Sequence, residues 1–152
     1  MLLSEPEWQA VWLTAQLAGV TTVILLLLGT PLAWWLSRRK GNVAAMIEAL
    51  VALPLVLPPT VLGFYLLLML APDTPLGRGW QALTGQPLAF SFEALVFGSV
   101  VYSLPFVVQP LQQAFARVPP YLMHAAGTLG AEPGDQFRSV VLPLTKRSFL
   151  VA

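Results

Sequence analysis

Three long runs without a charged side chain divide the sequence. They cover Trp8–Ser37, Ala49–Pro72 and Ala94–Ala116, with 30, 24 and 23 residues. The hydrocarbon core of a bilayer is about 30 Å thick, so about 20 helical residues cross it. Backbone groups in lipid must be satisfied within their own segment, and each run is therefore predicted to be a helix. We expect membrane spans at about 11–36, 48–71 and 92–116.

The composition agrees with this pattern. The chain is 57% hydrophobic and only 10% charged, whereas soluble domains carry roughly 25% charged residues. It has no cysteine and a net charge of +1, which excludes a disulfide framework or a cysteine-based metal site and argues against a nucleic-acid partner. No cofactor or metal is expected. The prediction is an all-α, polytopic integral membrane protein, with residues 1–152 in one domain and membrane lipid as its solvent.

Lysine and arginine are distributed asymmetrically around the spans. Only Arg78 lies between the second and third spans, and the other seven follow the first or the third span: Arg38, Arg39, Lys40, Arg117, Arg138, Lys146 and Arg147. Cytoplasmic loops carry an excess of positive charge. We therefore expect the N-terminus outside and the segment 119–147 in the cytoplasm. The basic group at 38–40 is interpreted as a topology signal, with a lipid-headgroup or partner site as the alternative.

Two further features predict structure near the membrane surfaces. The sequence Asp73-Thr74-Pro75 begins, and Gly85 ends, a short helix in the outer loop. Indole rings prefer the membrane interface, and four tryptophans bracket the first span. We interpret them as interface anchors: Trp8, Trp12, Trp34 and Trp35.

The second span contains three prolines within six residues. Each proline removes a backbone donor and disturbs the preceding turn, so this helix should bend or break. Irregular backbone at membrane depth is tolerated only when it is buried in protein or lines a water-filled cavity. A translocation path is therefore one interpretation, and an ordinary proline kink is the other. The candidate path residues are Pro54, Pro58, Pro59, Thr60, Gly63, Ser99 and Ser103.

The segment after the third span has a different, amphipathic pattern. Leu122, Ala125, Ala126 and Leu129 recur at the spacing of one helix face, and Gly130 should end this helix. A second short helix is expected from Pro133, with Phe137, Val140 and Val141 on one face and Leu142-Pro143 closing it. The apolar face of so short an element must dock either on the rest of this protein or on a soluble partner.

The spacing in this segment resembles the EAA loop of bacterial ABC-importer permeases. That loop reads Glu-Ala-Ala, three residues, Gly, nine residues, Ile, one residue, Leu-Pro. Here the matching positions are His124, Ala125, Ala126, Gly130, Val140, Leu142 and Pro143. His124 departs from the glutamate of the family, which leaves open either a pH switch or an ordinary exposed polar residue. The stretches EPEWQAVWLT and LPLVLPPTVLGFYLL also resemble the molybdate/tungstate-type permease subunit.

This resemblance implies a MetI-like helical fold in a bacterial inner membrane. It also implies a coupling loop at 119–147 and further sequence after a fourth span, whose start we predict at 148 from the residues SFLVA. A natural chain that is truncated there is the alternative. The expected partners are an ATP-binding-cassette ATPase, an external solute-binding protein and a second permease copy. The expected cargo is a tetrahedral oxyanion, molybdate first, with tungstate or sulfate as alternatives.

No arginine, lysine or histidine lies inside a span, so affinity for an anion would reside in the binding protein. The chain has no G-x-x-x-x-G-K-S/T loop and is not expected to be an enzyme. A membrane anchor or assembly protein without a transport path is the alternative in another class.

Overall fold

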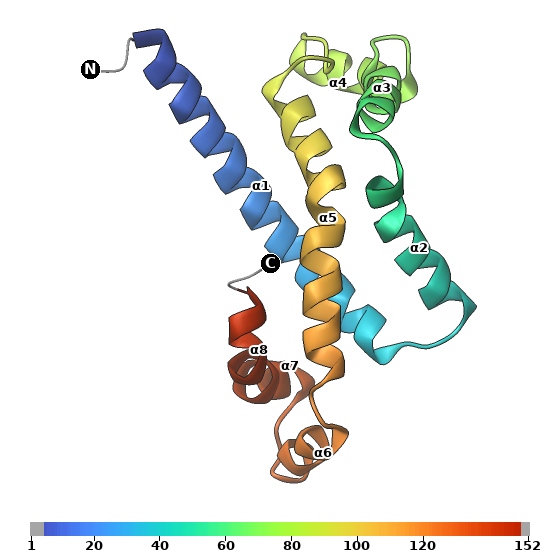
Figure 1. Cartoon of the computed structure of the whole chain (residues 1–152), viewed down its shortest axis with the longest axis vertical. Coiled ribbons are helices and arrows are strands. Elements are labelled where there is room, and N and C mark those ends of the chain that lie inside the picture. Colours follow the sequence, from blue (N-terminus) through green and yellow to red (C-terminus); the bar gives the residue numbers. More distant parts are fainter. Residues whose placement is uncertain (1–4, 150–152) are drawn as a thin grey trace. The chain divides into compact units, whose positions relative to one another are not determined.

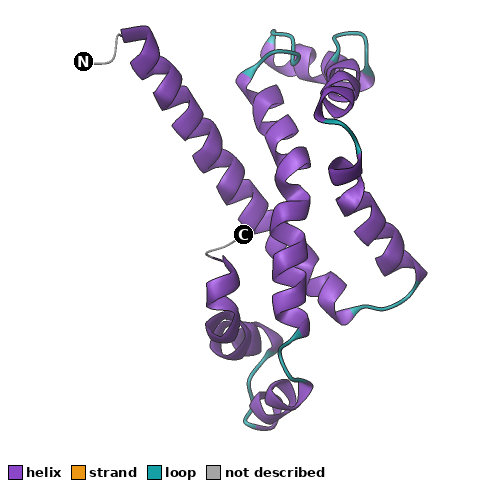
Figure 2. Cartoon of the chain, viewed as in Figure 1, coloured by secondary structure: helices purple, strands orange, loops and turns teal. Residues whose placement is uncertain are grey.

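The computed structural model describes residues 5–149, and all regular structure in this range is helical (Figure 2). The all-α prediction is therefore confirmed. The elements follow one another along the chain as α1 (Glu5–Arg38), α2 (Asn42–Val56), α3 (Pro59–Leu70), α4 (Pro75–Thr84), α5 (Phe92–Ala116), α6 (Pro120–Thr128), α7 (Pro133–Gln136), the π-helical segment η1 (Phe137–Val141) and α8 (Leu142–Phe149) (Figure 1). The start of a fourth span predicted from 148 falls almost wholly outside the described residues.

Within residues 5–149, two helices are long and apolar enough to cross a membrane by themselves. They are α1, over the 32 residues Glu7–Arg38, and α5, over the 25 residues Phe92–Ala116. The bounds of α5 agree with the span expected at 92–116, and α1 extends beyond 11–36 at both ends. Pro31, Pro105 and Pro110 lie inside these helices, as membrane helices tolerate.

The second expected span is a broken pair of helices. The axis bends by 112° between α2 and α3. Pro59 restricts the residue before it to extended conformations, and Pro58 has φ −56° and ψ 138°. The Pro58 carbonyl then accepts from Val61 N at 2.9 Å and Leu62 N at 3.0 Å, which starts α3. The predicted break is confirmed, but the helix begins at Asn42 rather than near 48.

The chain forms two compact units, which are described separately. The first comprises residues 1–26 and 52–103. In it, Thr74 caps α4 by accepting from Gly77 N at 3.0 Å, and its hydroxyl donates to Ala71 O at 2.8 Å, at the end of α3. Gly85 ends α4 with φ +75°. The short helix predicted between Thr74 and Gly85 is therefore confirmed.

The second unit comprises residues 27–51 and 104–152. Its core lies where the C-terminal parts of α1 and α5 pack, and Ala33, Leu111 and Phe115 are fully buried there. Gly29 allows this packing, because a Cβ at this position would lie 3.1 Å from Val107 Cγ1. Small residues bring membrane helices close together in the same way.

Candidate functional site

The segment 119–149 is a chain of short helical elements in the second unit. Pro119 has an extended backbone and Pro120 takes the first position of α6, where the missing N–H of proline has no consequence. The connection between α5 and α6 is thus set by two consecutive prolines. The helices α6 and α7 contact each other, and η1 contacts α6, α7 and α8.

The turn after α6 requires a glycine. Gly130 has φ +85°, a conformation that only glycine adopts without strain. Ala131 N donates to Ala126 O at 3.0 Å, and Gly130 N donates to Gly127 O at 3.0 Å. These two bonds form a Schellman motif, which satisfies the last carbonyls of the helix. The sharp glycine turn expected at this position is confirmed.

The side chain of Gln136, at the end of α7, bonds to the turn and lies beside α6. Its side-chain Nε2 donates to Ala131 O at 2.9 Å, and it would lie 3.3 Å from a Cβ built on Gly127. The sequence interpretation missed both residues. A usable signal was present, because a glycine inside a helix costs about 1 kcal/mol relative to alanine and calls for a packing reason.

The helix α6 turns much of its apolar surface away from the rest of the chain. None of its residues is fully buried, and the exposed fractions are 68% for Tyr121 and 88% for Leu129, just past its end. His124 and Ala125 are exposed, and Ala126 is half-buried. The part of the chain that the structure describes therefore does not cover this face.

The expectation that Leu142-Pro143 closes the second helix is wrong. The chain continues from η1 into α8 without a break. In an α-helix the ring of Pro143 would clash with the carbonyl four residues earlier. Here the preceding turn is π-helical, and Leu142 N donates to Phe137 O, five residues back. We attribute the tolerance of Pro143 to this wider turn. Val141 on η1 is fully buried, whereas Val140 is half-buried.

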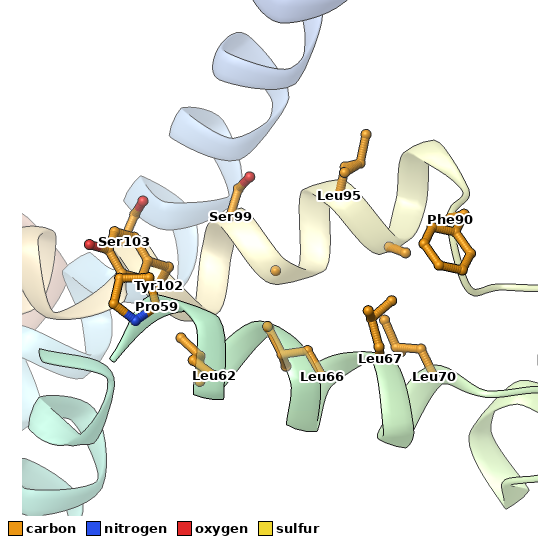
Figure 3. Close-up of a pocket in the computed structure, with 13 residues that line it drawn as sticks. Pro59, Leu62, Leu66, Leu67, Leu70, Phe90, Leu95, Ser99, Tyr102 and Ser103 are labelled. Atoms are coloured by element: carbon orange, nitrogen blue, oxygen red, sulfur yellow. The ribbon is translucent and has the colours of Figure 1, made fainter. Parts of the chain in front are cut away.

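A groove of about 540 Å³ lies between α3 and the N-terminal part of α5, within the first unit (Figure 3). Four predicted path residues line it: Pro59, Gly63, Ser99 and Ser103. The other three do not. Pro54 is buried within α2, and Pro58 and Thr60 are exposed at the break.

The groove wall is largely apolar. Leucines of α3, among them Leu62 and Leu66, point toward α5 in Figure 3, and the polar side chains of the wall are Ser99, Tyr102 and Ser103. Phe90 stands at one end with φ +66°, a strained backbone for a bulky residue. The lining contains no arginine, lysine or histidine, so an oxyanion in this groove would meet hydroxyl groups and no positive side chain.

Residues 11–152 match the family described as binding-protein-dependent transport system inner membrane component. The chain belongs to this family. The predicted resemblance to a permease of this type is thereby confirmed, and the segment 119–149 lies within the matched residues.

Individual relatives point to one subgroup of this permease family. The chain is 52% identical, over its whole length, to the "Molybdenum transport system permease protein ModB" of Azotobacter vinelandii. It is 34% identical over 99% of its length to the protein of that name from Escherichia coli K12 and 38% identical over 94% to that from Mycobacterium tuberculosis. It spans 67%, 66% and 54% of the lengths of these three relatives.

Proposed function

We propose that the protein is the membrane-spanning subunit of an ATP-driven importer and that its cargo is molybdate. The family and the molybdenum transport relatives support the class and the cargo. Tungstate or sulfate, which are tetrahedral oxyanions of the same charge, are the alternative cargoes. ATP hydrolysis is assigned to a partner subunit, because the sequence has no phosphate-binding loop of the G-x-x-x-x-G-K-S/T type.

The coupling role is assigned to α6 and the turn that follows it. The single observation that carries this assignment is the uncovered apolar surface of α6, which holds Tyr121 and leads to Leu129. A short helix with an exposed apolar face suits a groove on a soluble protein. The Schellman turn fixes the direction in which the chain leaves α6 toward α7. A displacement of α6 is therefore passed on to α7 and is not absorbed by a flexible loop.

The path is assigned to the groove between α3 and α5, completed by the same surface of a second copy. Its sparse polar wall, with Ser99 and Ser103, suits a route that a solute crosses without tight binding. High affinity then resides in an external solute-binding protein. His124, Ala125, Ala126 and Gly130 would approach the ATPase from the cytoplasmic side, and the positive-inside rule sets this orientation.

A reconstitution experiment tests the proposal. The native protein is tagged, purified from solubilised membranes with its accompanying subunits, and reconstituted into liposomes. We expect an ATP-binding-cassette subunit to accompany it, and uptake of molybdate that requires ATP and the binding protein. Competition with tungstate and sulfate then ranks the cargoes.

The anchor or assembly interpretation predicts a different result. The protein would be purified without an ATPase, or with one that hydrolyses ATP without any solute uptake. Either outcome would contradict the proposal.

A further inference from the structure

Three aromatic side chains meet in the second unit, and we refer to them as the aromatic cluster: Trp34 of α1, Phe115 of α5 and Phe137 of η1. The ring centroids are 5.5 Å apart for Trp34 and Phe115, 5.4 Å for Trp34 and Phe137, and 5.8 Å for Phe115 and Phe137. The interplanar angles of 84°, 78° and 64° are those of edge-to-face contacts. Such pairs add stabilisation beyond the area they bury.

The surroundings make this cluster a firm contact. Phe115 is fully buried, and Phe149 of α8 lies 6.0 Å from it between ring centroids. The guanidinium carbon of Arg38 lies 4.4 Å from the centre of the Trp34 ring, within the range of a cation–π interaction. One ring pair thus joins η1 to α1, another joins η1 to α5, and a third joins the two long helices.

We propose that Trp34 is a positioning residue that transmits displacement of α6 to α1 and α5. This inference rests on the proposed function, because it presupposes that a partner moves α6. The route runs from α6 through its contacts with α7 and η1 and then through Phe137 to the Trp34 and Phe115 rings. Close-packed contacts of this kind carry displacement, because they shift between discrete arrangements rather than deform continuously.

The neighbouring residues provide matched comparisons. Trp35 is also half-buried but makes no ring contact within residues 5–149. Arg39 is exposed like Arg38, and no cation–π contact is present at Arg39 in the same range. A role as interface anchor or topology signal would make both members of each pair equivalent. The proposed role distinguishes Trp34 from Trp35 and Arg38 from Arg39.

The experiment measures molybdate taken up per ATP hydrolysed in liposomes that hold the complete transporter. We expect Trp34→Leu, which keeps an apolar side chain and removes the ring, to lower this ratio about tenfold while ATP hydrolysis continues. Perturbing a residue that couples two sites commonly changes the coupling by about this factor. Trp34→Phe, which retains a ring, should restore most of the ratio. Trp35→Leu should leave the ratio within about twofold of wild type, a range that falls below a typical coupling effect.

Arg38→Gln and Arg39→Gln extend the comparison. Arg38→Gln removes the cation over the ring and should lower the ratio by about twofold to fivefold, since a cation–π pair is weaker than two ring contacts. Arg39→Gln should leave it unchanged.

The outcomes separate this inference from the proposed function. If the wild-type complex shows no ATP-dependent uptake, the proposed function is wrong. If the wild type transports and Trp34→Leu transports equally well per ATP, only the role of Trp34 is wrong. If Trp34→Leu does not assemble, Phe137→Leu is measured in its place. A normal ratio in Phe137→Leu, or failure of this variant to assemble as well, would mean that the cluster serves folding alone.

Discussion

Replacing Gly130 with alanine tests the turn that orients α6. The φ of this residue is +85°, and a Cβ built on it meets no atom within 4 Å. Crowding therefore contributes nothing, and the whole effect comes from the backbone. A left-handed conformation costs an L-residue about 1–2 kcal/mol. Asparagine tolerates this region better than alanine, so Gly130→Asn should have a smaller effect.

Gly134 provides the matched control for this substitution. It lies in α7 of the same segment, a Cβ there also meets nothing within 4 Å, and its φ is not positive. Gly134→Ala should be neutral or slightly stabilising, because alanine is favoured over glycine in helices by up to about 1 kcal/mol.

Hydrogen exchange of the purified complex, measured by mass spectrometry, reads out the turn directly. The amides of Gly130 and Ala131 close the Schellman motif, so their exchange reports its opening. A loss of 1–2 kcal/mol raises the open population about 5- to 30-fold. Exchange should be fastest in Gly130→Ala, intermediate in Gly130→Asn and slowest in wild type. Equal exchange in Gly130→Ala and Gly134→Ala would refute the reasoning from backbone strain.

Three further perturbations test other parts of the account. Gly77→Ala should lower the thermal unfolding temperature of the detergent-solubilised protein by several degrees, because its Cβ would lie 2.0 Å from Ala71 O and overpacking costs about 1–3 kcal/mol. Gly79→Ala, whose Cβ would meet nothing within 4 Å, should leave this temperature unchanged, and equal shifts in the two variants would rule out the close approach at Gly77. The double variant Pro58→Ala with Pro59→Ala should let α2 and α3 continue as one helix and lower molybdate uptake at least tenfold, about the effect of mutating a residue that couples strongly to another site. Unchanged uptake would favour an ordinary proline kink. The double variant Arg39→Gln with Lys40→Gln should increase the fraction of molecules inserted in the reverse orientation, measured by protease access to a terminal tag. Uptake per correctly inserted molecule should stay the same, and a loss of uptake in correctly inserted protein would indicate a binding role for these two residues.

Local signals made several elements predictable. Thr74 and Gly85 bound α4 because a cap side chain and a left-handed residue act within one turn of the chain. Pro119 and Pro120 separate α5 from α6 for the same local reason. The left-handed turn at Gly130 also followed from the residue type alone.

Other features depend on tertiary structure and could not be predicted in this way. The prolines at 54, 58 and 59 all predict a disturbed helix, yet Pro54 remains inside α2 and the helix breaks at the Pro58–Pro59 pair. The break lies there because Pro59 constrains the ψ of Pro58. The helix continues past Pro143 because the preceding turn is π-helical, and the spacing of apolar residues in the sequence does not predict such a turn.

The candidate sites show the same division. The position of the proposed coupling segment follows from sequence spacing. The contacts of Trp34 with Phe115 and Phe137 join residues about 80 to 100 positions apart, and single-residue preferences carry no information about such partners. The interface preference of tryptophan predicted only the location of Trp34 near the end of a span.

The central claim is that the end of α6 docks on an ATP-hydrolysing subunit, and a single-cysteine cross-linking pair tests it most directly. The sequence has no cysteine, so Leu129→Cys and Leu83→Cys each introduce one reactive thiol. The two leucines are equally exposed, at 88% and 86%, and Leu83 lies on α4, on the predicted opposite side of the membrane. With a thiol-directed photoreactive cross-linker, the account predicts a product between the ATP-binding-cassette subunit and Leu129→Cys, and none with Leu83→Cys. No product at position 129, or equal products at both positions, would contradict it.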